Sequence, residues 1–174
     1  FITPEAYNAD DDRVAEDMAA GRPKLGRLYE LYTKRCFRSG AMDFDDILIN
    51  TYRLFENYPD TLNKYQQKFR FVLVDEYQDT NYVQYLIVKK LAAVNRNLCV
   101  VGDDAQSIYA FRGANIQNIL NFEYDYPELS VYKLEKNYRS TKNIVAASSH
   151  LIRYNQEQLE KHLYTDNQEG PKIK

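Results

Sequence analysis

The chain has no tryptophan, only two cysteines and six glycines among its 174 residues, and no long hydrophobic run. Cys36 and Cys99 are too few for a disulfide framework, so we expect reduced thiols, as in an intracellular protein. No apolar stretch approaches the roughly 20 residues that a membrane-spanning helix requires. The first residues are polar and acidic, unlike a signal peptide. We therefore expect a cytoplasmic protein with no membrane contact.

Neither sign of charge dominates the chain. It has 23 basic and 25 acidic residues and a net charge of −2, which argues against a simple basic nucleic-acid-binding protein. Residues 22–38 nevertheless contain six basic residues and only one acid, Glu30. Such a segment can follow phosphates or can simply be the solvated face of a helix, and the sequence leaves both interpretations open.

The first third of the chain has helical patterns. Leucines at three-residue spacing predict an amphipathic helix over residues 24–38, which Ser39 and Gly40 would end. A second helix is expected to open at Asp43, because the acids that follow suit the positive end of a helix dipole. Residues 60–68 are expected to form a short third helix.

Residues 71–74 are four consecutive apolar residues followed directly by Asp75 and Glu76. A continuous apolar run is typical of a strand that is buried on both faces of a parallel sheet. Ligands in such sheets bind beyond the carboxyl ends of the strands, where the acid pair falls. One carboxylate there can hold a divalent cation and its neighbour can deprotonate a water molecule. Strands also end in acids simply because the chain returns to solvent.

A second apolar run over residues 98–101 ends in a polar segment that contains Gly102 and Gln106. Between the two runs, residues 82–94 have the spacing of a crossover helix, so the sequence predicts a βαβ unit. Gly102 permits a tight exit from the second strand, and Gln106 supplies an amide that can hydrogen-bond a phosphate or a water molecule. The fold class we expect is therefore α/β, with a parallel sheet, flanking helices and a helical N-terminal segment.

The last third of the chain predicts one helix between Gly113 and Pro127, a third strand near residues 131–134, and a long helix capped by Ser140 and Thr141. The closing residues 165–174 have the composition of a linker or of a truncated element. His150 and His162 have no metal-ligand spacing, so we assign them no role.

Four segments together resemble the motifs of UvrD/Rep/PcrA-type superfamily 1 DNA helicases. Residues 75–80 (DEYQDT) resemble their Walker B motif, and residues 101–114 (VGDDAQSIYAFRGA) resemble their third motif. Residues 134–141 (LEKNYRST) are similar to the fourth motif, and residues 42–48 (MDFDDIL) match a segment that precedes Walker B. The order and the spacing agree over about residues 25–155.

The resemblance implies ATP and Mg²⁺ as cofactors and gives roles to particular residues. Asp75 would coordinate Mg²⁺, Glu76 would be the general base, and Gln106 would sense the γ-phosphate. Tyr138 would stack near the adenine, and Arg139 would reach the γ-phosphate as an arginine finger.

The resemblance also implies that Tyr109, Phe111 and Arg112 face single-stranded DNA. An aromatic ring can stack on a base without reading its identity, which contributes ~1–3 kcal/mol per base. Many relatives have tryptophan where this chain has Phe111, so its base contact has a smaller stacking face. Outside the family context, Phe111 could be a core aromatic and Tyr138 could equally be a packing residue. Arg139 could then form a surface ion pair with a nearby acid.

The sequence lacks the phosphate cradle G-x-x-x-x-G-K-[ST], because none of its glycines precedes a lysine. We therefore interpret it as an internal part of a longer chain and expect no useful ATP hydrolysis by this part alone. The resemblance implies that the whole is a helicase with 3′-to-5′ polarity that acts on single-stranded and duplex DNA. Residues 1–40 would be the tail of a helical insertion domain, 41–127 the second half of a first RecA-like motor domain, and 128–174 the start of a second. The remainder of the helicase chain would then be its partner.

A non-enzymatic interpretation stays open. In it the chain is an α/β module of helicase ancestry that binds single-stranded DNA or a protein and has lost catalysis. The acid pair Asp75 and Glu76, with Gln106 and Arg139, argues against it, because a binding module has no evident use for all four.

Overall fold

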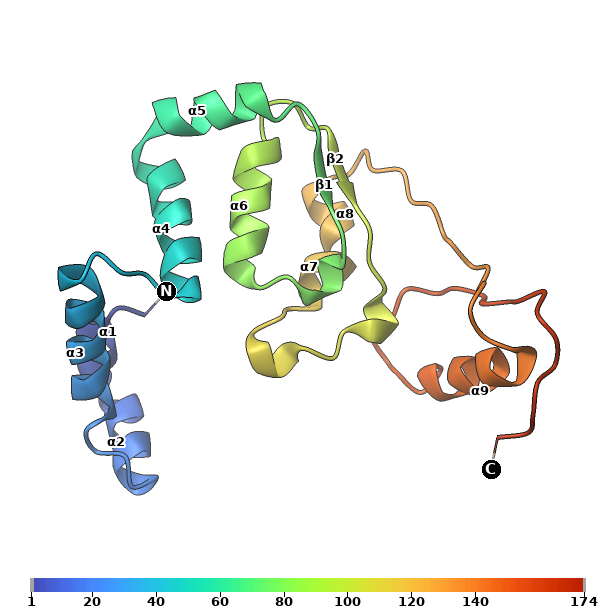
Figure 1. The fold of residues 1–174 in the computed structure, drawn as a ribbon, viewed down its shortest axis with the longest axis horizontal. Helices are drawn as coiled ribbons and strands as arrows, with labels where there is room; N and C mark the ends of the chain where they lie inside the picture. The colour runs from blue at the N-terminus through green and yellow to red at the C-terminus, as the bar shows by residue number, and fades with distance from the viewer. Residues whose placement is uncertain (1, 174) are drawn as a thin grey trace. The chain divides into compact units, whose positions relative to one another are not determined.

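A computed structural model describes residues 2–173 of the chain (Figure 1). The chain divides into two compact units, residues 1–67 and residues 68–174. The first unit is helical, and the second contains the sheet together with the flanking helices. The fold is α/β, as the sequence predicts.

The described residues of the first unit form five helices. Tyr7 of α1 contacts α2 and α3: its hydroxyl donates to Asp17 at 2.7 Å, and its ring meets that of Tyr29 edge to face with 6.0 Å between centroids. These polar and aromatic contacts join short helices that bury few apolar residues. The bounds are α1 Pro4–Asn8, α2 Asp11–Ala19, α3 Leu25–Arg38, α4 Phe44–Asn57 and α5 Pro59–Lys68.

The predicted helices of this unit are confirmed. Helix α3 ends at the expected residues, and Gly40 has a φ of 61°, a left-handed conformation that glycine adopts without strain. Helix α4 begins after Asp43, whose side chain accepts the backbone N–H of Asp46, while Asp46 accepts that of Asp43. This reciprocal capping fixes the start of α4 in the segment that resembles a helicase motif.

The second unit contains the predicted βαβ arrangement. Strand β1 (Val72–Val74) pairs in parallel with β2 (Leu98–Val100), with Leu73 opposite Cys99. Helix α6 (Tyr82–Ala92) connects them and packs against β1 (Figure 1). Asn81 and Gln84 cap α6 reciprocally, so the helix begins at Tyr82, shortly after the turn that follows the acid pair.

The expectation of a strand buried on both faces is wrong for this chain. Leu73 is 74% exposed, and its neighbour Cys99 is also exposed, whereas Val72 and Val74 on the opposite side are half-buried. Helix α6 packs against β1, and no described element covers the face of Leu73 and Cys99. Cys99 is therefore a surface thiol rather than a core residue.

The core of the second unit lies beneath the turn that follows β1. The ring of Tyr77, which is buried, meets Phe122 edge to face at 5.5 Å, and Phe122 stacks on Tyr126 at 4.7 Å. Asn118 donates from its side chain to the backbone carbonyl and the hydroxyl of Thr80. This packing holds the segment after β1 against the helices α7 (Gln117–Leu120) and α8 (Phe122–Asp125). The single helix predicted before Pro127 is thus two short ones.

Residues 131–134 form no strand, contrary to the prediction. They are exposed. Next to them, Lys136 forms an isolated parallel bridge with Tyr164. A strand needs a partner for its ladder of hydrogen bonds, and β2 pairs with β1 alone among the described strands.

The last helix, α9 (Lys142–Ile152), begins where predicted but is capped differently. The hydroxyl of Thr141 makes no capping bond. Instead, the carbonyls of Gln168 and Glu169 accept the N–H groups of Lys142 and Asn143, both at 3.1 Å. No helix among residues 2–173 is both long and apolar enough to cross a bilayer.

Candidate nucleotide site at the strand tips

The two strands bring their polar tips together. The N–H of Val101 donates to the carbonyl of Val74 at 2.8 Å, and the N–H of Tyr77 donates to the carbonyl of Val101 at 2.9 Å. Between these bonds lie Asp75 and Glu76, both exposed. Glu76 has a φ of 50°, a left-handed conformation that is uncommon for a residue with a side chain. The pairing of the strand tips therefore imposes a sharp turn at the acid pair.

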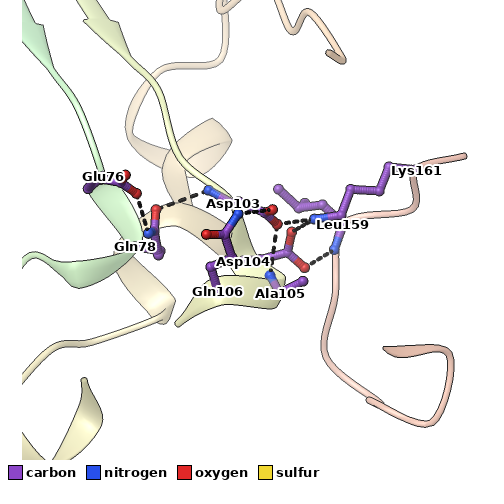
Figure 2. A network of polar contacts seen from close by, with 8 residues as sticks. All are labelled: Glu76, Gln78, Asp103, Asp104, Ala105, Gln106, Leu159 and Lys161. Atoms are coloured by element: carbon purple, nitrogen blue, oxygen red, sulfur yellow. Dashed lines mark hydrogen bonds and ion pairs between the residues drawn. The ribbon is translucent and has the colours of Figure 1, made fainter. Parts of the chain in front are cut away.

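A network of hydrogen bonds joins Glu76 to Gln106 across the tips (Figure 2). The Gln78 side chain lies between the two segments and is only 1% exposed as a residue. Its Nε2 donates to Glu76 Oε2 at 2.8 Å, and its Oε1 accepts the N–H of Asp103 at 3.0 Å. Gln106 then donates from Nε2 to Asp103 Oδ2 at 2.7 Å. Glu76 and Gln106, both predicted site residues, are thus linked through two intervening residues, Gln78 and Asp103.

Gly102 is needed at this point because of close packing. A Cβ atom there would lie 2.7 Å from Gln78 Oε1 and 2.9 Å from Ile119 Cδ1. Its φ is not in the left-handed region, so the tight exit predicted for this glycine depends on its missing side chain rather than on an unusual backbone angle.

Lys161 closes the network from a distant part of the chain, and sequence reasoning missed it. Its Nζ donates to Asp104 Oδ1 at 2.7 Å and also contacts Asp103 Oδ1. Burial raises the pKa of Asp103, but the hydrogen bonds from Lys161 and Gln106 outweigh it and hold that pKa below its usual range. Burial lowers the pKa of Lys161, and the bonds to both aspartates more than compensate and raise it. Asp103 and Lys161 are therefore both charged at neutral pH.

Asp75 stands beside this network. Its Oδ1 accepts the N–H of Glu76 at 2.9 Å. Within residues 2–173 no group of three or more His, Cys, Asp or Glu side chains is arranged to hold a metal ion by itself. A single exposed carboxylate is, however, the kind of ligand that Mg²⁺ uses when phosphates and water fill its other positions.

Tyr109, Phe111 and Arg112 are brought together. The rings of Tyr109 and Phe111 lie 6.0 Å apart, and the guanidinium carbon of Arg112 lies 5.3 Å and 5.4 Å from their centroids. Phe111 is 78% exposed, so it is a surface aromatic and not a core residue. The short helical turn Ala110–Arg112, labelled η3, carries two of the three residues, which explains their proximity.

Tyr138 and Arg139 lie on the exposed loop before α9. The Tyr138 ring is open to solvent, with Lys136 Nζ 5.3 Å from its centroid. Asn137 Oδ1 accepts the N–H groups of Arg139 and Ser140 at 3.0 and 2.7 Å. In the described part of the chain no side-chain bond joins Arg139 to Glu76 or Gln106, so the structure does not bring all the predicted catalytic residues together.

Residues 3–127 match the family of the UvrD/REP helicase N-terminal domain. This chain belongs to the UvrD/REP helicase family. The matched range includes the acid pair, Gln106 and the aromatic cluster of residues 109–112, and it ends before Tyr138 and Arg139.

Relatives of this UvrD/REP chain are ATP-dependent DNA helicases named PcrA. It is 54% identical to the protein of Staphylococcus epidermidis over 149 residues, which are 86% of this chain and 20% of that protein. It is 53% identical to the Staphylococcus aureus protein over 149 residues, with the same two shares. It is 51% identical to the Bacillus subtilis protein over 146 residues, 84% of this chain and 20% of the relative. The chain thus spans about a fifth of the length of these relatives.

A cavity of about 470 Å³ lies elsewhere in this UvrD/REP chain, against α9. Its lining includes Lys142, His150 and Arg153 and none of the predicted site residues. At the strand tips, hydrogen bonds place Glu76, Gln78 and Gln106 relative to one another. Lys161 could have been noticed in the sequence only as a lysine outside every motif.

Proposed function

We propose that this chain is part of an ATP-dependent DNA helicase of the PcrA type, and that the strand-tip network belongs to its ATP-hydrolysing site. The observation that supports the proposal best is the chain of hydrogen bonds from Glu76 through Gln78 and Asp103 to Gln106. It links a carboxylate suited to general-base chemistry to an amide suited to contact a phosphate or a water molecule.

Glu76 is the proposed general base. Its Oε2 is held by Gln78, and a carboxylate that is held in one orientation can accept a proton from a water molecule placed beside it. Gln106 is the proposed group that contacts the γ-phosphate. Because its Nε2 is committed to Asp103, its Oε1 is the atom available to a water molecule, and the amide would have to turn to donate to phosphate.

Asp75 is the proposed ligand of Mg²⁺. It is exposed, and one of its oxygens accepts a backbone N–H, which orients the other, so the residue fits an oxygen-seeking cation. When bound with ATP, Mg²⁺ neutralises charge on the phosphates. Tyr138 and Arg139 are proposed to contact the adenine and the γ-phosphate. Their open loop leaves both side chains accessible to a nucleotide.

The proposed organisation is RecA-like, with residues 1–40 from a helical insertion, 41–127 from a first motor domain and 128–174 from a second. The direction proposed for translocation is 3′ to 5′, and the proposed substrates are single-stranded and duplex DNA. These 174 residues contain no G-x-x-x-x-G-K-[ST] cradle. Without it the β- and γ-phosphates lack their main anchor, so this chain alone is proposed not to hydrolyse ATP at a useful rate.

A chimera tests the catalytic assignment. The matching segment of Bacillus subtilis PcrA is replaced by this chain, and ATP hydrolysis is measured with and without single-stranded DNA. The chimera is expected to hydrolyse ATP, and Glu76→Gln is expected to reduce the turnover number by at least about a hundredfold, as loss of a general base does. Glu123→Gln, an exposed glutamate away from the network, is the matched control.

An active chimera that tolerates Glu76→Gln would refute the role of Glu76. A chimera that has the circular dichroism of a folded protein but no activity would refute the assignment of the chain. Steady hydrolysis by the 174-residue chain alone, abolished by Glu76→Gln, would refute its proposed inactivity.

The second candidate is a non-catalytic module that binds single-stranded DNA. The exposed cluster of Tyr109, Phe111 and Arg112 favours it, because stacking faces and a cation are what such a surface needs. Tight, salt-sensitive binding of an oligonucleotide by this chain alone would support the module. Weak binding would support a part of a larger DNA track.

A further inference from the structure

Residues 157–168, here called the strap, contact two of the proposed site segments. At one end, the N–H of Leu159 donates to Asp104 Oδ2 at 2.9 Å, close to the ion pairs of Lys161 with Asp103 and Asp104 (Figure 2). Glu157 accepts a bond from Gln117 of α7 at 2.9 Å. The first half of the strap is thus attached to the strand-tip region.

The second half of the strap is attached to the loop before α9. The N–H of His162 donates to Glu135 Oε1 at 2.8 Å. The N–H of Tyr164 donates to the carbonyl of Glu135 at 3.0 Å, and the carbonyl of Tyr164 accepts the N–H of Asn137 at 2.7 Å. These two backbone bonds form a single parallel bridge between Tyr164 of the strap and Lys136.

The same half of the strap also holds the backbone on both sides of Arg139. Asn167 donates from Nδ2 to the carbonyl of Tyr138 at 3.3 Å and to that of Ser140 at 3.0 Å. Thr165 donates from its hydroxyl to the carbonyl of Ser140 at 3.2 Å. The backbone carbonyls of the two residues next to Arg139, Tyr138 and Ser140, therefore have donors in the strap.

Lys161 is the strongest attachment at the strand-tip end. Its side chain is 19% exposed and meets two carboxylates, of which Asp104 is 3% exposed. Removing one partner of a buried ion pair lowers the stability strongly, because the other charge is left buried without a partner. Asp103 bonds Lys161 through Oδ1 and Gln106 through Oδ2, so the lysine fixes the carboxylate that orients Gln106.

We propose that Lys161 is a positioning residue, and that the strap holds Gln106 and the Arg139 loop as one mechanical unit. The consequence for ATP hydrolysis rests on the proposed function: a displacement of Gln106 would also move Arg139, and a displacement of Arg139 would also move Gln106. The linkage itself depends only on bonds within residues 68–174. Coupling of this kind is reciprocal, so a change at either end alters the other.

The test measures amide hydrogen exchange by NMR in the 174-residue chain without nucleotide. Lys161→Met is expected to speed exchange at Leu159 and, through the strap, at Arg139 and Ser140 by about fivefold or more. Lys161→Arg, which keeps the charge and the donors, is expected to retain at least part of the protection. Lys133→Met is the control, since Lys133 is exposed and forms no ion pair in the described part of the chain.

A milder variant acts from the opposite end. Asn167→Ala removes the two bonds to the Arg139 loop and is expected to speed exchange at Asp103 and Leu159. If Lys161→Met speeds exchange at Leu159 alone, or if Asn167→Ala leaves Asp103 and Leu159 unchanged, the coupling is refuted. Because nucleotide is absent from every sample, these outcomes do not depend on whether Glu76 acts on ATP, which the chimera tests separately.

Discussion

Gln78 Oε1 accepts the backbone N–H of Asp103 at 3.0 Å and so joins the tips of two parallel strands. The side chain that makes this bond is buried, and its Nε2 holds the exposed carboxylate of Glu76. A buried glutamine therefore sets the distance between the two segments that carry the predicted catalytic residues.

Replacing Gln78 with leucine keeps the volume and removes both hydrogen bonds. The N–H of Asp103 then lacks its acceptor, so the free energy of unfolding is expected to fall by about 1–3 kcal/mol. Urea denaturation followed by circular dichroism measures it. Gln156→Leu, at an exposed glutamine, is the control and is expected to change little. Equal stability of the Gln78 variant and wild type would contradict the bridging role.

Replacing Gly102 with alanine places a methyl group 2.7 Å from Gln78 Oε1. Either Gln78 moves or the strand exit shifts, and the expected loss of stability is about 1–3 kcal/mol. The double variant Gln78→Ala/Gly102→Ala removes the clashing oxygen. In urea denaturation, its loss of unfolding free energy is expected to be smaller than the sum of the losses for Gln78→Ala and Gly102→Ala alone. Strict additivity would show that the two residues do not interact.

Replacing Phe111 with alanine removes a stacking face from the aromatic cluster. In the chimera with Bacillus subtilis PcrA, the affinity for a labelled single-stranded oligonucleotide is expected to fall about tenfold, within the ~1–3 kcal/mol of one stacked base. Fluorescence anisotropy at two salt concentrations measures it. Tyr124→Ala removes an equally exposed ring from α8, outside the cluster, and is expected to have no effect. Similar losses for both variants would point to a nonspecific surface effect.

Asp125 makes stability depend on pH in the acid range. Burial raises its pKa, but hydrogen bonds from Lys89 and Tyr85 lower it below that of a free aspartate. A folded-state pKa below the unfolded one contributes stability above the unfolded pKa of about 3.9. That stability is lost as pH falls through the lower folded value.

Asp125→Asn is therefore expected to flatten the fall in unfolding free energy between about pH 5 and pH 2, measured by urea denaturation at several pH values. Asp12→Asn, at an exposed aspartate on α2, serves as the control. Parallel curves for wild type and Asp125→Asn would contradict this role of Asp125.

Neighbouring residues on opposite faces of β1 are expected to respond differently to the same chemical change. Leu73→Thr alters an exposed side chain, so the unfolding free energy is expected to stay within about 0.5 kcal/mol of wild type. Val72→Thr puts a hydroxyl on the covered face, and a loss of about 1 kcal/mol or more is expected. Leu73 and Cys99 form an exposed apolar patch, which Leu73→Thr makes smaller. Sedimentation velocity is therefore expected to show no more self-association for Leu73→Thr than for wild type.

Much of the helical framework was predictable because its signals are local. The end of α3 at Ser39 and Gly40 and the start of α4 at Asp43 depend on residues within one turn of each boundary. The βαβ unit was predictable for a similar reason, since two short apolar runs on either side of a helical segment leave few other arrangements. The resemblance to helicase motifs located the acid pair and Gln106 without any coordinates.

Other predictions depended on partners that the sequence does not name. Residues 131–134 have strand-forming side chains, but no described strand pairs with them. Leu73 is apolar, but no element within residues 2–173 covers it. Thr141 occupies the capping position of α9, yet carbonyls of residues 168 and 169 bind the free N–H groups instead. In each case contacts with residues far away in the sequence decide the outcome.

The sequence by itself determined the longer helices from α3 to α6 and α9, the two paired strands, and the acids and amides that follow them, because these features depend on neighbours a few residues apart. Only the tertiary structure decided that Gln78 is the bridge and that Lys161 binds Asp103 and Asp104. Those bonds join residues 25 to 58 positions apart. Hydrophobic periodicity carries no information about such pairs, because a polar side chain finds its partner only after the chain has folded.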